Sequence, residues 1–422
     1  MIRALAAPAA AILAMTPAAV AADDSESCDA WAATPAAWDE VERALRANYA
    51  YLDRVDDPDA LLARAGEAAR LAGTIGELAR LTETLGYAFR DGHFHIRPVS
   101  APERAWIPSS SDFWVARSDG RWIVSDVRQR SDAAGSGIRP GWEVRKMNGE
   151  SIEAAARAAL APVVDEPSPA QLEYAANVVL TGFLGQARSF TFESPDGRRT
   201  LELPPAQQSL GERPDTGLTV FEHNGIARIR FNNSLGDNAM IEAFDRAISN
   251  AQDARGLIID LRDTPGGGNT TVARAILGHF VDKPAIYQVH RNAYEEAVFG
   301  VRRQYAEYVF PRGDRFTGPV AVLAGRWTGS VGEALAMAFD RTVGAETIGS
   351  PLADLLGTLN NSETDNGCLR FAFAWDRLVA ADLSAREDWE PATRIEAADT
   401  AADGSDAALA AALTWMDGER SE

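Results

Sequence analysis

The chain has 422 residues, of which 46% are hydrophobic and 24% are charged. Its 41 lysines and arginines against 61 aspartates and glutamates give a formal net charge of −20, and only Lys146 and Lys283 are lysines. An acidic surface repels phosphate backbones and anionic lipid, so we expect neither nucleic acid nor a membrane surface as partner. The apolar content excludes a disordered chain, and the length predicts two or three domains.

Residues 1–22 have the pattern of a secretory signal peptide. Arg3 gives a basic start, residues 4–20 are apolar and small, and alanines precede Asp23. The stretch is too weakly apolar for a membrane anchor. We therefore expect cleavage near Ala22, a periplasmic or secreted protein, and no membrane insertion once the signal is removed.

Two cysteines, Cys28 and Cys368, are present. In an oxidising compartment they would pair and constrain the unfolded chain by roughly 5 kcal/mol in the entropic model. Two unrelated thiols remain the alternative at this stage. Two cysteines do not make a zinc site, and we expect no metal and no cofactor.

Residues 30–100 are predicted to form a helical bundle. Thr34-Pro35, Asp57-Pro58 and Thr74 are helix starts, and each is followed by apolar residues at helical spacing. The last helix ends before Asp91-Gly92-His93, where glycine breaks the helix and a strand is expected to begin.

Residues 104–162 are predicted to form a small β-rich domain. Two short β runs flank Ser118-Asp119-Gly120, which is a hairpin signal. The segment 131–149 then resembles the bacterial PDZ pattern, with Asp132 in place of a proline and Trp142 in place of an aspartate. A PDZ-like domain binds an extended peptide by strand addition, and we assign substrate binding to Phe113, Trp114 and Val115. The alternative is a β-rich insert without a ligand.

Residues 165–420 alternate strands and helices, which predicts a mostly parallel sheet covered by helices. One strand, 256–261, runs into Gly266, Gly267 and Gly268. A P-loop is excluded because no Gly-Lys-Ser/Thr follows, and the Rossmann glycine spacing is absent. An oxyanion hole and a plain strand-to-helix turn both remain open.

A second strand, 320–324, leads to Ser330 at the start of an apolar helix. Helix N-termini favour negative charge, so a serine there suits a nucleophile whose oxyanion is held by backbone N–H groups. The more common role of such a serine is to cap the helix. The serine alone does not decide between the two roles.

The two segments together resemble the tail-specific, or C-terminal processing, serine peptidase family, which includes the tricorn core protease and the interphotoreceptor retinoid-binding repeats. The shared marks are the Leu-Arg-Asp-Thr-Pro-Gly-Gly run from Leu261, the Ser-x-x-Glu motif formed by Ser330 and Glu333, and Ile348-Gly349. The resemblance implies that Ser330 is the nucleophile. It also implies an oxyanion hole formed by the N–H of Val331 and a glycine at 266–267.

The general base distinguishes two branches of this family. The better-known branch uses a lysine about 25 residues after the serine, and this chain has none there. The tricorn-like branch takes a histidine just after the helical bundle, which implies His93. That branch has a serine before the histidine, where Gly92 stands here. Its distant glutamate points to Glu387, chosen over Glu390.

The sequence thus predicts an α+β multidomain protein with a helical bundle, a PDZ-like domain and an α/β core of the crotonase/ClpP-like type. The predicted function is an exported serine endopeptidase that cleaves unfolded or tail-exposed polypeptides. The alternative is a non-catalytic peptide- or ligand-binding protein on the same fold. An acyl-CoA enzyme of crotonase type is disfavoured by the acidic, lysine-poor chain. The sequence does not give the oligomeric state.

Overall fold

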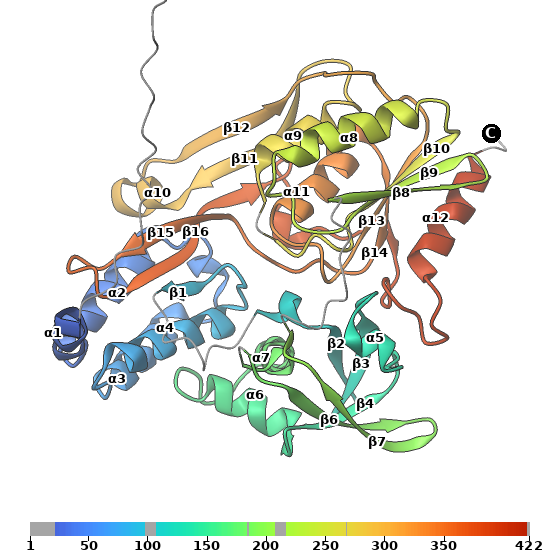
Figure 1. The fold of residues 1–422 in the computed structure, drawn as a ribbon. Coiled ribbons are helices and arrows are strands. Elements are labelled where there is room, and N and C mark those ends of the chain that lie inside the picture. Colours follow the sequence, from blue (N-terminus) through green and yellow to red (C-terminus); the bar gives the residue numbers. More distant parts are fainter. Residues whose placement is uncertain (1–21, 98–106, 184, 207–216, 267, 420–422) are drawn as a thin grey trace, which may run out of the picture.

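The computed structural model describes residues 22–97, 107–183, 185–206, 217–266 and 268–419. Of the predicted signal peptide, residues 1–22, only Ala22 is among the described residues. Three sheets and their helices form a mixed α/β fold (Figure 1). Within the described ranges, no helix is both long enough and apolar enough to cross a membrane.

Four helices form the N-terminal part and pack on one another in pairs. Three of them begin at the predicted caps, and Asp57 and Thr74 each accept a hydrogen bond from the first turn of their helices. The first helix was not predicted. Cys28, on that helix, forms a disulfide with Cys368 with a Cα–Cα distance of 5.3 Å. The helices are α1 (Ala22–Ala32), α2 (Pro35–Asn48), α3 (Pro58–Ala69) and α4 (Ile75–Phe89).

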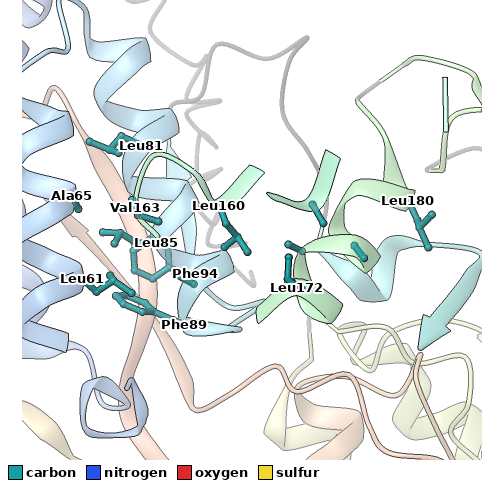
Figure 2. Packing of buried hydrophobic residues seen from close by; sticks show 14 of the residues in the cluster. Leu61, Ala65, Leu81, Leu85, Phe89, Phe94, Leu160, Val163, Leu172 and Leu180 are labelled. Carbon is teal, nitrogen blue, oxygen red and sulfur yellow. The ribbon is translucent and has the colours of Figure 1, made fainter. Parts of the chain in front are cut away.

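The second part is an antiparallel sheet in the order β2-β3-β4-β6-β7, with β5 paired to β4. Its buried face shares one hydrophobic cluster with the N-terminal helices, and Figure 2 shows Leu160 and Val163 close to Leu85 and Phe94. The strands are β2 (Phe113–Ser118), β3 (Arg121–Val127), β4 (Glu143–Met147), β5 (Glu150–Ser151), β6 (Arg188–Ser194) and β7 (Gly197–Leu203); the helices are α5 (Asp132–Gly135), α6 (Ile152–Leu160) and α7 (Pro169–Thr181).

The edge of β2, where a peptide site is predicted at Phe113, Trp114 and Val115, is in contact with α7. The side-chain amide of Asn177, on α7, accepts from the Val115 N–H and donates to the Val115 carbonyl oxygen, both over 2.9 Å. Strand addition needs those two backbone groups to be free. All three predicted residues are also buried. The bonds from Asn177 therefore oppose strand addition at Val115, and the substrate-binding assignment to Phe113, Trp114 and Val115 stays a prediction.

The C-terminal part contains a six-stranded sheet in the order β17-β14-β13-β10-β9-β8, parallel except for β8. One face packs against α8, α9 and α11, and the other packs against α12. The parallel sheet with helices on both faces agrees with the predicted alternation. The elements are β8 (Leu218–His223), β9 (Ile226–Phe231), α8 (Ala239–Asn250), β10 (Gly256–Asp260), α9 (Thr270–Leu277), β13 (Val320–Ala324), α11 (Val331–Ala338), β14 (Glu346–Gly349), β17 (Thr393–Arg394) and α12 (Ala407–Gly418).

A third sheet, antiparallel and in the order β1-β16-β11-β12 with β15 beside β16, was not predicted as a unit. It joins the strand after α4 to strands nearly 300 residues later (Figure 1). The pairing of β1 with β16 places the segment that follows His93 beside the C-terminal part of the chain. The elements are β1 (His95–Arg97), β11 (Ala285–Asn292), α10 (Ala293–Phe299), β12 (Arg303–Val309), β15 (Thr358–Glu363) and β16 (Arg370–Val379).

Candidate active site

Ser330 lies at the N-terminus of α11 in a conformation that a side-chain-bearing residue rarely adopts. Its φ is 55° and its ψ is −114°. The hydroxyl makes no capping hydrogen bond to the helix, so the capping role does not apply. Strained backbone conformations cluster at active sites. A strained serine whose hydroxyl makes no hydrogen bond to the helix backbone therefore fits a nucleophile.

The turn before Ser330 is interlocked with the glycine-rich turn after β10. The Gly329 N–H donates to the Thr264 carbonyl oxygen over 2.8 Å, and Thr264 and Thr328 form a parallel bridge. A Cβ on Gly332 would lie 2.3 Å from the Thr264 hydroxyl oxygen, so only glycine permits this approach. The two motifs singled out in the sequence therefore form a single structural unit.

Gly266 and Val331, predicted to form the oxyanion hole, both lie next to Ser330. Gly266 has a φ of 134°, and a Cβ built on it would lie 4.0 Å from the Ser330 Cβ. Val331 is the first residue of α11, whose leading N–H groups have no partner within the helix. Gly267, the third predicted member, lies outside the described residues.

His93 follows α4 and is buried in a tight turn. Its backbone N–H donates to the Asp91 carboxylate over 2.8 Å, and Asp91 in turn accepts from the Tyr49 hydroxyl over 2.9 Å. Burial lowers the pKa of His93 to about 4, and the Arg386 guanidinium acts in the same direction. Burial also raises the pKa of Asp91 to about 7. The imidazole is therefore neutral at neutral pH.

The imidazole tautomer follows from its backbone partner. His93 Nδ1 lies 2.6 Å from the Leu356 carbonyl oxygen. Since a carbonyl only accepts, Nδ1 carries the proton and Nε2 is left as the acceptor. Leu356 lies in the segment where the lysine of the other family branch was sought. Here the segment provides a carbonyl that orients a histidine.

The glycine at position 92, a departure from the tricorn-like pattern, has a steric reason. A Cβ on Gly92 would lie 2.5 Å from a methyl carbon of Leu355. Leu355 and Leu356 are both nearly inaccessible to solvent. A serine at this position would require the Leu355 side chain, next to Leu356, to shift.

Ser330 and His93 line the same cavity of about 420 Å³. Among the described residues that line the cavity, none is an aspartate or glutamate. Among the residues that the structure describes, no hydrogen bond joins Ser330 to His93. The remaining lining residues are mostly small or apolar: His95, Ile107, Pro265, Gly266, Gly268, Gln288, Val331, Ala334, Leu355, Gly357, Thr358, Leu359, Leu378 and Arg386.

Glu387, predicted to orient His93, does not line this cavity. Its carboxylate lies 3.5 Å from Arg54 and 3.8 Å from Arg377. The structure therefore shows no contact behind the predicted orienting role, and the Leu356 carbonyl occupies that place at Nδ1. Glu390, the alternative, is exposed and pairs with Arg394.

Two charged residues at the site, Glu333 and Arg386, were given no role from the sequence. Glu333, the last residue of Ser-x-x-Glu, is buried, and its carboxylate accepts from the Leu355 N–H over 2.9 Å and from the Arg386 guanidinium. Burial raises the pKa of Glu333 to about 7, against the effect of Arg386. Arg386 stands next to the predicted Glu387, and that proximity was the only available signal.

Three further histidines have partners away from Ser330. His279 lies between Asp245 and the Asp314 carbonyl, and His290 lies between Glu307 and Asp376. The His223 ring contacts the neighbouring Asn224. His95, two residues after His93, lines the same cavity as His93.

One protein-family model matches part of the chain. Residues 225–367 match the family described as Peptidase family S41, and this range includes the glycine-rich turn and Ser330. No curated protein matches the sequence.

Solved structures are similar over nearly the whole chain. Mature CPAF is 15% identical with a TM-score of 0.60, over 92% of this chain and 96% of that chain. The photosystem II D1 C-terminal processing protease is 13% identical with a TM-score of 0.52, over 89% and 94%. A putative peptidase from Parabacteroides merdae ATCC 43184 is 14% identical with a TM-score of 0.52, over 93% and 96%.

At these identities the solved structures show a common fold, and the family match places the Ser330 motif within it. Residues 225–367 of the chain thus match Peptidase family S41, and this match to a peptidase family, together with the shared fold, supports a serine-type peptidase.

Proposed function

We propose that the protein is an exported endopeptidase that cleaves unfolded or tail-exposed polypeptides with Ser330 as nucleophile and His93 as general base. The observation that carries the proposal is the single cavity that holds both side chains, with His93 fixed as the Nε2 acceptor by the Leu356 carbonyl. Export is supported by the signal-like residues 1–22 and by the disulfide, which fits an oxidising compartment.

The proposed reaction uses only groups of this chain and water. His93 Nε2 takes the hydroxyl proton as Ser330 Oγ attacks the scissile carbonyl, and the oxyanion is held by the N–H groups of Gly266 and Val331. The proton then passes to the leaving amine, and water releases the acyl group by the same route. The hydrogen bond between Ser330 and His93 would form when substrate binds, because catalytic hydrogen bonds often tighten only in the Michaelis complex.

The lining of the cavity indicates which stretches of polypeptide the site would accept. The described lining of the cavity combines apolar side chains with His93, His95 and Arg386. These walls favour apolar stretches of polypeptide, such as those exposed in an unfolded chain. The β2 edge is closed, so we do not place the substrate there.

The test is covalent labelling with a fluorophosphonate probe. The proposal expects one adduct on Ser330, none in Ser330→Ala, and strongly reduced labelling in His93→Gln. Ser109→Ala is the matched control, because Ser109 is buried outside the cavity lining. A folded wild-type protein that takes up no label would favour the non-catalytic binding protein on the same fold.

A further inference from the structure

Arg386 connects the nucleophile to Glu333. Its Nε and Nη2 atoms donate to one Glu333 carboxylate oxygen over 3.0 and 2.6 Å, and Nη2 also donates to the Ser330 carbonyl oxygen. The side chains of Arg386 and Glu333 are 3% and 2% exposed. The pair is therefore a buried ion pair in direct contact with the backbone of the nucleophile.

The strained backbone of Ser330 needs such a contact. A positive φ with a Cβ persists only where the surroundings determine it. The Ser330 carbonyl oxygen accepts the first helical hydrogen bond from the Ala334 N–H over 3.2 Å. Arg386 adds a charged donor to the same oxygen, and charge-assisted hydrogen bonds are the stronger kind.

The position of Arg386 is itself fixed from both sides. It begins a short 3-10 helix, Arg386–Asp388. After it, the Trp389 indole donates to Asp340, at the end of the nucleophile helix, over 2.8 Å. Beside it, Glu387 faces Arg54 of the N-terminal helices. On the other side, Glu333 is held by the Leu355 N–H.

We propose that Arg386 is a positioning residue: pinned by Glu333, it holds the Ser330 backbone in the conformation that turns the hydroxyl into the cavity. This inference rests on the proposed function of Ser330. The guanidinium also places a fixed positive charge on the cavity wall that His93 shares. Arg386 thus links the geometry of the nucleophile to the electrostatics of the base.

The electrostatic part predicts a readout that a merely structural residue would not change. The other titratable groups around the His93 turn are Asp91 in the turn, His95 in the cavity, and Asp354 in the segment that carries Leu356. Arg386 is the cation that opposes protonation of His93. Removing it should raise the pH at which activity falls on the acid side.

The test compares Arg386→Met with Arg394→Met, an arginine at the surface of the same segment, in the full-length protein. We expect the crystal structure of Arg386→Met to show Ser330 with a negative φ. We also expect kcat on an unfolded polypeptide to fall about 100-fold with little change in KM, the size of effect that misplacing a reacting group by about 1 Å produces. The acid limb of kcat/KM should move to higher pH. Arg394→Met should match the wild type in all three.

A second variant keeps the inference falsifiable if Arg386→Met does not fold. Glu333→Gln preserves size and an acceptor oxygen but removes the charge that pins Arg386, so kcat should fall without an upward shift of the acid limb. Arg386→Met with φ still near 55°, or Glu333→Gln with full kcat, would overturn the inference. A wild type that hydrolyses nothing would refute the proposed function alone, because the Ser330 backbone still reports on Arg386.

Discussion

Asn177 closes the edge of β2, and the hydrogen bonds it makes there predict how much its removal lowers the free energy of unfolding. Asn177 is fully buried, and its amide bonds the Val115 N–H, the Val115 carbonyl and the Glu173 carbonyl, each over 2.9 Å. Asn177→Ala leaves the two Val115 groups without a partner. An unsatisfied buried polar group costs about 1–3 kcal/mol, so for the two groups we expect a loss of about 2–6 kcal/mol.

The assay is urea unfolding followed by tryptophan fluorescence, with Asn250→Ala as control because Asn250 is exposed at the end of α8. A second readout is binding of an extended peptide, which the wild type should not show at this edge. If Asn177→Ala unfolds at the same urea concentration as the control, the side chain does not close the strand edge and the reasoning fails.

Three further predictions concern the site and its surroundings. The acid limb of kcat/KM should lie near pH 4, because burial lowers the pKa of His93 to about 4, and a limb near pH 6.5 would contradict a buried base. Burial raises the pKa of Asp399 to about 7, so the stability that this carboxyl contributes is present at acidic pH and is lost as pH rises towards 7. Asp399→Asn should accordingly stabilise the protein more at pH 8 than at pH 4 in urea titrations, and an equal gain at both would refute the shift. Gly92→Ala should displace Leu355 and lower kcat/KM about 100-fold in a peptide-hydrolysis assay, whereas full activity would show that the turn has room.

The helices and the turn that holds Ser330 could be predicted from the sequence because both depend on short-range signals. Helix caps at Asp57 and Thr74 lie at the true helix starts. The glycine run and Ser330 could be recognised as a pair because backbone approach and a helix N-terminus each need particular residues at close spacing.

The remaining parts of the site depend on contacts between distant segments. The carbonyl that orients His93 belongs to Leu356. Because every residue has a backbone carbonyl, the residue type at 356 does not indicate this contact. In the third sheet, β1 pairs with β16. The two strands lie far apart in the sequence, and hydrophobic periodicity within each strand does not show that they pair. Glu387 was chosen by position, but the side chain that reaches Ser330 belongs to its neighbour Arg386, because successive side chains of a 3-10 helix point about 120° apart.

The most direct test of the account is a crystal structure of the protein after reaction with a peptidyl phosphonate. The account predicts a bond from phosphorus to Ser330 Oγ and a phosphoryl oxygen against the N–H groups of Gly266 and Val331. It also predicts His93 Nε2 within about 2.6–3.2 Å of the reacting oxygens. An adduct on another residue, or a bound phosphonate at Ser330 with His93 out of hydrogen-bond reach, would contradict it.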